Sequence, residues 1–103
     1  MTAIGLLSVS PVEEGSMAED VARAVEAIEE YDVSYETNPM GTVIEADEVG
    51  EVFAAAQAAH EAVDAARVST SLRIDDERTQ TTSAREKVDA VEEILGHEAR
   101  RER

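Results

Sequence analysis

The sequence predicts an α+β fold in which four strands and three helices follow in the order β-α-β-β-α-β-α. Short segments of alternating polar and apolar residues are separated by longer ones in which apolar residues recur every three or four positions. Two helix starts carry the Ser-x-x-Glu capping pattern, at Ser16 and at Ser83. A Pro-Met-Gly turn at residues 39–41 reverses the chain between two strand segments. This order is that of a ferredoxin-like βαββαβ sandwich with an additional C-terminal helix, built on an antiparallel four-stranded sheet.

The first strand is expected over Ala3–Ser10, bounded by Pro11. Its apolar residues fall on both faces, which is typical of a central strand that is covered above and below. The first helix opens at Gly15-Ser16, where Ser16 and Glu19 form a capping box. Its apolar stripe has helical spacing and comprises Met17, Val21, Val25 and Ile28.

A β-hairpin is expected next, with strands over Val33–Asn38 and Thr42–Ala46. Pro39 presets φ and Gly41 permits a positive φ, which is what a tight reversal requires. A hairpin that only packed a core would not need the polar residues that these strands carry, which are Glu36, Asn38, Thr42 and Glu45. The hairpin is therefore the most informative stretch for function.

The second helix is expected to begin near Asp47-Glu48, where acidic residues suit the positive end of the helix dipole. Its apolar stripe comprises Val49, Val52, Phe53, Ala56, His60 and Val63. A single histidine on such a stripe is more often a hydrogen-bonded core residue than a ligand or a base. No second histidine stands at a metal-binding offset from His60, so we expect no zinc site.

The fourth strand alternates over Val68–Ile74, with Val68, Thr70, Leu72 and Ile74 on one face and Ser69, Ser71 and Arg73 on the other. The polar segment Asp75–Thr82 lacks the ligand spacing of a calcium loop, and we interpret it as a solvated loop or a place for salt bridges between subunits. The third helix starts at Ser83 with Glu86 in the capping pattern and ends at Gly96. Its stripe is Val88, Val91 and Leu95, and residues 97–103 are expected to fray.

The composition indicates one acidic domain over residues 1–103. The formal net charge is −15, which argues against nucleic acid and anionic membranes as partners because like charges repel. The chain has no cysteine, which excludes a disulfide framework and thiolate chemistry. Aromatic residues make up only 3% of it, so the core must be aliphatic, and oligomerisation is the expected source of added stability.

The acid-rich composition, with Lys87 as the single lysine, is typical of proteins from a high-salt cytoplasm. At ~1 M salt the Debye length is about 3 Å, so the repulsion among the acidic residues is screened. The N-terminal residues lack the basic and apolar regions of a targeting signal, and no apolar run approaches the ~20 residues that span a bilayer. We therefore expect a halophilic cytoplasmic protein.

The sheet face turned away from the helices is the best candidate site. Strand alternation and the usual strand order place on it Ser8, Ser10, Glu36, Asn38, Glu45, Ser71 and Arg73. The alternative is an ordinary solvated face, or an Arg–Glu network between subunits. The residues alone do not decide between these interpretations.

Three stretches of the chain point to a known family. They read YETNPMGTVIEAD (residues 35–47), AAHEAV (58–63) and LRIDDER (72–78). On these three stretches, the sequence resembles the small thiamine-binding protein family, and the resemblance covers nearly the whole chain. The resemblance implies a ferredoxin-like fold, a homotetramer built from dimers through sheets and C-terminal helices, and recognition of thiamine or its hydroxymethylpyrimidine part. Thr79–Thr82 departs from the more basic loop expected in the family.

The polar residues match the chemistry of that ligand. An aminopyrimidine presents an amino donor flanked by ring-nitrogen acceptors, and amide and hydroxyl side chains match both. Glu36 or Glu45 can accept from the amino group or pair with a protonated ring nitrogen, and Met40 offers a soft apolar contact. We predict non-catalytic binding, with no cofactor or metal, through Ser8, Ser10, Glu36, Asn38, Met40, Thr42, Glu45, Ser71 and Arg73.

Two other functions stay open. The first is an oligomeric regulatory module that senses another small molecule or binds a protein partner. The second is an enzyme, which would need a paired nucleophile and base. Only His60 with nearby carboxylates offers such a pair, and the chain has neither Gly-x-Ser-x-Gly nor a glycine-rich phosphate loop.

Overall fold

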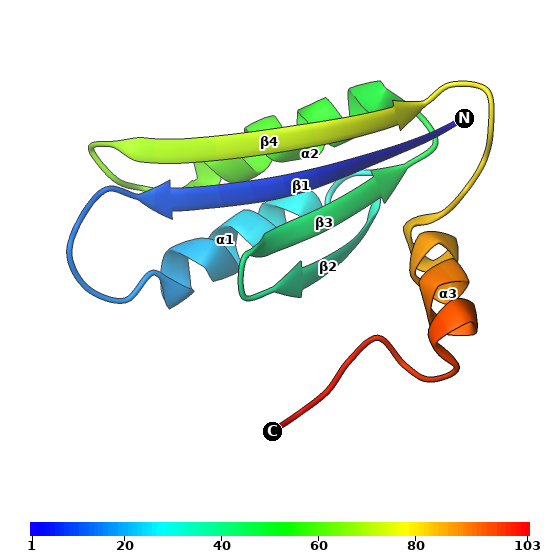
Figure 1. Ribbon diagram of the computed structural model, residues 1–103. Coiled ribbons are helices and arrows are strands. Elements are labelled where there is room, and N and C mark those ends of the chain that lie inside the picture. The colour runs from blue at the N-terminus through cyan, green and yellow to red at the C-terminus, as the bar shows by residue number, and fades with distance from the viewer.

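The computed structural model describes residues 1–103 and contains a four-stranded antiparallel sheet and three helices (Figure 1). The strands lie in the order β2-β3-β1-β4 and span Thr2–Pro11 (β1), Ser34–Asn38 (β2), Gly41–Ala46 (β3) and Val68–Glu77 (β4). The helices span Ala18–Ile28 (α1), Val49–Ala62 (α2) and Ala84–Leu95 (α3). The predicted ferredoxin-like arrangement with an additional C-terminal helix is confirmed.

Helices α1 and α2 lie together on one face of the sheet, and the core fills the space between them and the strands (Figure 1). The core is aliphatic, as the composition predicts, and much of what α2 buries is alanine, so this helix approaches the sheet closely. Gly5 of β1 lies against α2, and a Cβ added at this position would lie 2.8 Å from Val52 Cγ1. The eleven buried apolar residues are Ala3, Leu7, Ala24, Ile28, Ile44, Ala46, Val52, Ala55, Ala56, Ala59 and Val63.

Helix α3 stands beyond the sheet, apart from α1 and α2 (Figure 1). None of its residues is buried, and its apolar side chains Val88, Val91, Ile94 and Leu95 are exposed. Its N-terminus is held, because the Ser83 hydroxyl accepts from the Glu86 N–H at 3.1 Å and the Glu45 carboxylate accepts from the Ala84 N–H. The helix start predicted at Ser83 is therefore confirmed.

Strand β4 continues past its predicted end. The residues Asp75, Asp76 and Glu77 pair with the first residues of β1, so the predicted loop over Asp75–Thr82 is wrong in its first part. Strand β4 is an edge strand, where Asp75 reaches solvent, whereas Asp76 is half-buried and pairs with Arg78 at 3.1 Å. The extension brings Asp75 within 3.0 Å and Glu77 within 3.7 Å of Lys87 Nζ on α3.

Two details of the helices differ from prediction. Helix α1 is not capped by Ser16: Met17 is the N-cap residue, and the Ser16 hydroxyl accepts only from the Ala18 N–H at 3.3 Å. On α2, Phe53 is 56% exposed and His60 is exposed as well, so neither belongs to the core. Alanines one turn away are buried instead, since the close approach of α2 to the sheet leaves no room for larger side chains. No helix has both the length and the hydropathy that crossing a bilayer requires.

Candidate functional site

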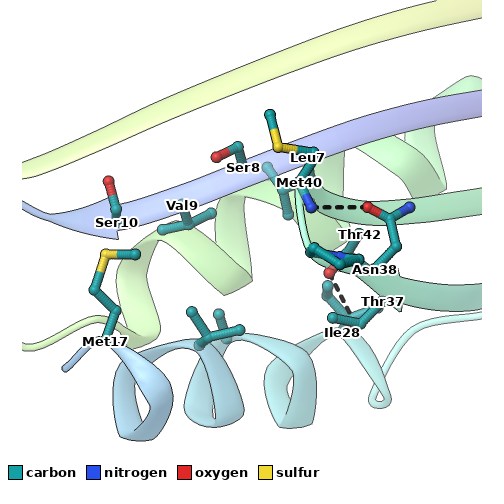
Figure 2. Close-up of a pocket in the computed structure, with 14 residues that line it drawn as sticks. Leu7, Ser8, Val9, Ser10, Met17, Ile28, Thr37, Asn38, Met40 and Thr42 are labelled. Atoms are coloured by element: carbon teal, nitrogen blue, oxygen red, sulfur yellow. Dashed lines mark hydrogen bonds between the residues drawn. The ribbon is translucent and has the colours of Figure 1, made fainter. Parts of the chain in front are cut away.

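A pocket opens where β1 extends past the β2–β3 hairpin, and we call it the hairpin pocket (Figure 2). Strand β1 pairs with β3 as far as Leu7↔Thr42, but with β4 as far as Pro11↔Val68. Residues 8–10 therefore have a strand on one side only, and their other side faces the hairpin turn and α1. The resulting cavity has a volume of about 200 Å³.

The hairpin pocket has an apolar floor and a polar rim. Leu7 from β1 and Ala24 and Ile28 from α1 are buried beneath it. Met17 at the start of α1 and Met40 in the hairpin turn lie at its edge, each with an exposed side chain (Figure 2). The polar residues that line it are Ser8, Ser10, Thr37, Asn38 and Thr42.

The hairpin turn orients its polar groups by local hydrogen bonds (Figure 2). The Asn38 side-chain oxygen accepts from the Met40 N–H at 3.0 Å, which leaves the amide nitrogen of Asn38 free to donate elsewhere. The hydroxyls of Thr37 and Thr42 lie 2.9 Å apart, and Thr42 is only 5% exposed. Gly41 permits the turn to sit against β1, since a Cβ there would lie 2.7 Å from the Leu7 carbonyl oxygen.

A second contact ties the hairpin to the helix layer. The Tyr35 hydroxyl donates to the Glu29 carboxylate at 2.6 Å, just past the end of α1. This hydrogen bond raises the pKa of Tyr35 above its ordinary value, because the protonated hydroxyl is the form that can donate. The contact joins β2 to α1 next to Ile28 and Thr37, which both line the hairpin pocket.

The structure brings five of the predicted ligand-binding residues together. Ser8, Ser10, Asn38, Met40 and Thr42 all line the hairpin pocket. Thr42 reaches it from the helix-facing side of the sheet, because its register partner Leu7 is a core residue. The pocket thus lies at the end of the sheet and draws on both faces.

The other four predicted residues do not line the hairpin pocket. Glu36 and Glu45 line a shallow cleft beside Arg85 of α3, where Glu45 is already engaged at the helix N-terminus. Ser71 is paired opposite Ser8, and Arg73 opposite Leu6, on the sheet face turned away from α1 and α2. The strand register puts all the residues predicted from alternation on the sheet face turned away from α1 and α2, but only three of them, Ser8, Ser10 and Asn38, also line the hairpin pocket.

Sequence reasoning missed several residues of the hairpin pocket. Helical periodicity places Met17 and Val21 only on the apolar stripe of α1, and strand alternation does not place Thr37 on the predicted site face. Thr37 carries the clearest signal, because a symmetric hairpin about Pro39-Met40 places it opposite Thr42. The contribution of α1 has no comparable signal in the sequence, since it depends on how the helix lies against β1.

The hairpin pocket contains no ionisable side chain among its lining residues. His60 is not among the lining residues, and its Nδ1 lies 2.5 Å from the Thr70 hydroxyl. Nowhere in the structure do three or more histidine, cysteine, aspartate or glutamate side chains gather as metal ligands would. The lining therefore offers a ligand hydroxyl and amide groups and no charged side chain.

Comparison with known proteins identifies relatives of the chain. A family model described as "Thiamine-binding protein" matches residues 6–92. A UPF0045 protein of Methanothermobacter thermautotrophicus is 46% identical over 83 residues, which is 78% of this chain and 84% of that protein. A UPF0045 protein of Bacillus subtilis is 34% identical over 102 residues, which is 90% of this chain and 97% of that protein.

Solved structures share the fold. The crystal structure of a hypothetical protein from Methanocaldococcus jannaschii matches with a TM-score of 0.82 and 34% identity, covering 89% of this chain and 97% of that one. A Thermotoga maritima protein, named as a candidate thiamine biosynthesis/salvage protein, matches with a TM-score of 0.75 and 24% identity. It covers 88% of this chain and 99% of that one.

Proposed function

The chain belongs to the thiamine-binding protein family, and from this premise we propose that it binds thiamine, or the hydroxymethylpyrimidine half of thiamine, without catalysis. The family is named for binding and not for a reaction. The observation that carries the proposal is the hairpin pocket, which has an apolar floor and a rim of hydroxyl and amide groups. Flat heteroaromatic ligands are bound in such surroundings, with a few polar groups fixing their orientation.

Asn38 is the residue that we assign to the ring-nitrogen acceptors. Its side-chain oxygen is occupied by the Met40 N–H, so its amide nitrogen presents two donors. The Ser8 and Ser10 hydroxyls, which can donate or accept, serve the amino group. Because β1 has no neighbouring strand on this side, its backbone is also available to a planar ligand.

We further propose that the protein acts as a homotetramer in the cytoplasm, with residues 1–103 forming one thiamine-binding-type domain. The exposed apolar residues of α3 and of the open sheet face support association, because an aliphatic core of this size gains stability from it. Ser71 and Arg73 lie on that open face and stay predictions as ligand contacts, as do Glu36 and Glu45. A charge of −15 supports neither nucleic acid nor an anionic membrane as a partner.

Isothermal titration calorimetry with thiamine and with hydroxymethylpyrimidine tests the proposal. The Ser10→Ala variant should weaken binding, because it removes a hydroxyl from the pocket rim. Ser69→Ala is the matched control, since Ser69 faces Ser10 across the β1–β4 pair but does not line the pocket. If Ser10→Ala and Asn38→Ala both leave the affinity unchanged, the hairpin pocket is not the site.

The same titration separates the open sheet face from the hairpin pocket. Loss of affinity in Ser71→Ala and Arg73→Gln, with Ser10→Ala unaffected, would place the ligand on the open face. No heat with either compound would favour the alternative, an oligomeric regulatory module that senses a different small molecule.

A further inference from the structure

We propose that the hairpin pocket selects the unphosphorylated ligand and rejects phosphate esters such as thiamine diphosphate. This inference rests on the proposed function, because it specifies the class of ligand that the same pocket accepts. It starts from the absence of any arginine, lysine or histidine among the lining residues. Proteins that bind phosphate esters usually hold the charge with arginine forks, lysine or a helix N-terminus.

The helix start beside the hairpin pocket does not supply the missing positive charge. Met17 brings the N-terminus of α1 to the edge of the pocket, but the first turn carries Glu19 and Asp20. Arg23, the one basic residue of α1, pairs with these two carboxylates at 3.9 and 3.3 Å. Together with the preceding Glu13-Glu14, they leave this end of the helix negative.

The size of the hairpin pocket determines where a phosphate would lie. A volume of about 200 Å³ is smaller than the ~300–1,000 Å³ of pockets that enclose a drug-sized ligand. The hairpin pocket therefore holds one ring of thiamine, and the rest of the molecule extends out of the pocket. If the pyrimidine is inside, the thiazolium ring and its hydroxyethyl arm, which carries the phosphates, lie at the mouth. There the acidic surface of a chain of net charge −15 attracts the thiazolium cation and repels a diphosphate.

Calorimetric titrations of the full chain with thiamine and thiamine diphosphate, in ~0.1 M and ~1 M NaCl, test the selectivity. At low salt we expect thiamine to bind at least about tenfold more tightly, because the ester adds charge of the same sign as the protein. High salt screens this repulsion, so the ratio of the two affinities should narrow. Equal affinities at low salt, or a ratio that salt does not change, would overturn the electrostatic argument.

A gain of phosphate affinity provides the second test. Met17→Lys places a cation at the edge of the hairpin pocket, and Met17→Gln is the uncharged control of similar length. Relative to Met17→Gln, the lysine variant should bind thiamine diphosphate at least about fivefold more tightly and shift the preference away from thiamine. An unchanged preference contradicts the inference. Absence of thiamine binding to the unmodified chain overturns the proposed function itself, whereas equal binding of thiamine and its diphosphate overturns only the selectivity.

Discussion

Replacing Gly5 by alanine tests whether the close approach of α2 to β1 is as tight as the structure shows. The new Cβ would lie 2.8 Å from Val52 Cγ1 and 3.3 Å from Leu72 Cδ1. Val52 is fully buried, so its side chain has little space into which it can move. Overpacking of this kind costs about 1–3 kcal/mol, of which the lower entropy of the unfolded chain returns about 0.4–1 kcal/mol. We expect a net loss of about 1–2 kcal/mol in the free energy of unfolding.

The measurement is urea unfolding followed by far-UV circular dichroism, at one protein concentration and one salt concentration because association changes apparent stability. Gly50→Ala is the control: a Cβ there meets nothing within 4 Å, so the substitution should not destabilise the protein, and in the first turn of α2 it should stabilise it by less than the roughly 0.5–1 kcal/mol of a helix interior.

A double-mutant cycle isolates the contact between residues 5 and 52. Val52→Ala removes two buried carbons, which costs roughly 2 kcal/mol. It also makes room for a methyl group at position 5, so Gly5→Ala should become nearly neutral in that background. Additive effects of the two substitutions, within ~0.5 kcal/mol, would refute the packing argument.

Three further predictions concern α3, the hairpin and the surface charge. Ser83→Ala removes the hydrogen bond that the Ser83 hydroxyl accepts from the Glu86 N–H at 3.1 Å, so it should destabilise helix α3 by about 1 kcal/mol. Amide hydrogen exchange should then accelerate in α3 while β1 stays protected. Equal acceleration in β1 would contradict the separation of α3 from the core. The pKa of Tyr35 is raised in the fold, so its contribution to stability is complete below the unfolded value of about 10 and is lost as pH rises through the folded pKa. The melting temperature should therefore fall less between pH ~9 and ~11 in Tyr35→Phe than in the unmodified protein, and equal falls would show that the contact is not made. The net charge of −15 predicts that the melting temperature rises between ~0.1 M and ~1 M NaCl, because salt screens the repulsion among the acidic residues. An unchanged melting temperature would contradict the prediction of a halophilic protein.

The sequence predicted the hairpin residues that line the hairpin pocket better than the residues that α1 contributes to it. Asn38, Met40 and Thr42 could be identified because the Pro-Met-Gly turn fixes the hairpin, and polar residues within its strands have no role in a core. Met17 and Val21 could not, since helical periodicity shows which face of α1 is apolar but not where that face meets β1. The packing of α1 against the sheet decides that contact.

Glu36 and Glu45, which the sequence predicts as ligand contacts together with Ser8, line a cleft beside α3 and not the hairpin pocket. Strand alternation correctly places Glu45 on the face opposite the core, in register with Ile4 of β1. Alternation does not show what lies above that face. Here the N-terminus of α3 binds the Glu45 carboxylate, and Arg85 stands beside Glu36.

The sequence by itself determined the order of the elements, the identity of the core residues in the strands and the position of the hairpin turn. These follow from local periodicity and turn chemistry, which act over a few residues. The tertiary structure alone decided that β1 extends past its partner β3, that α1 closes the gap, and that α3 engages Glu45. Those features depend on strand register and on contacts between residues distant in sequence, such as the 39 positions that separate Glu45 from Ala84. The pocket exists because two strands of unequal length meet a helix, and no local pattern encodes that difference.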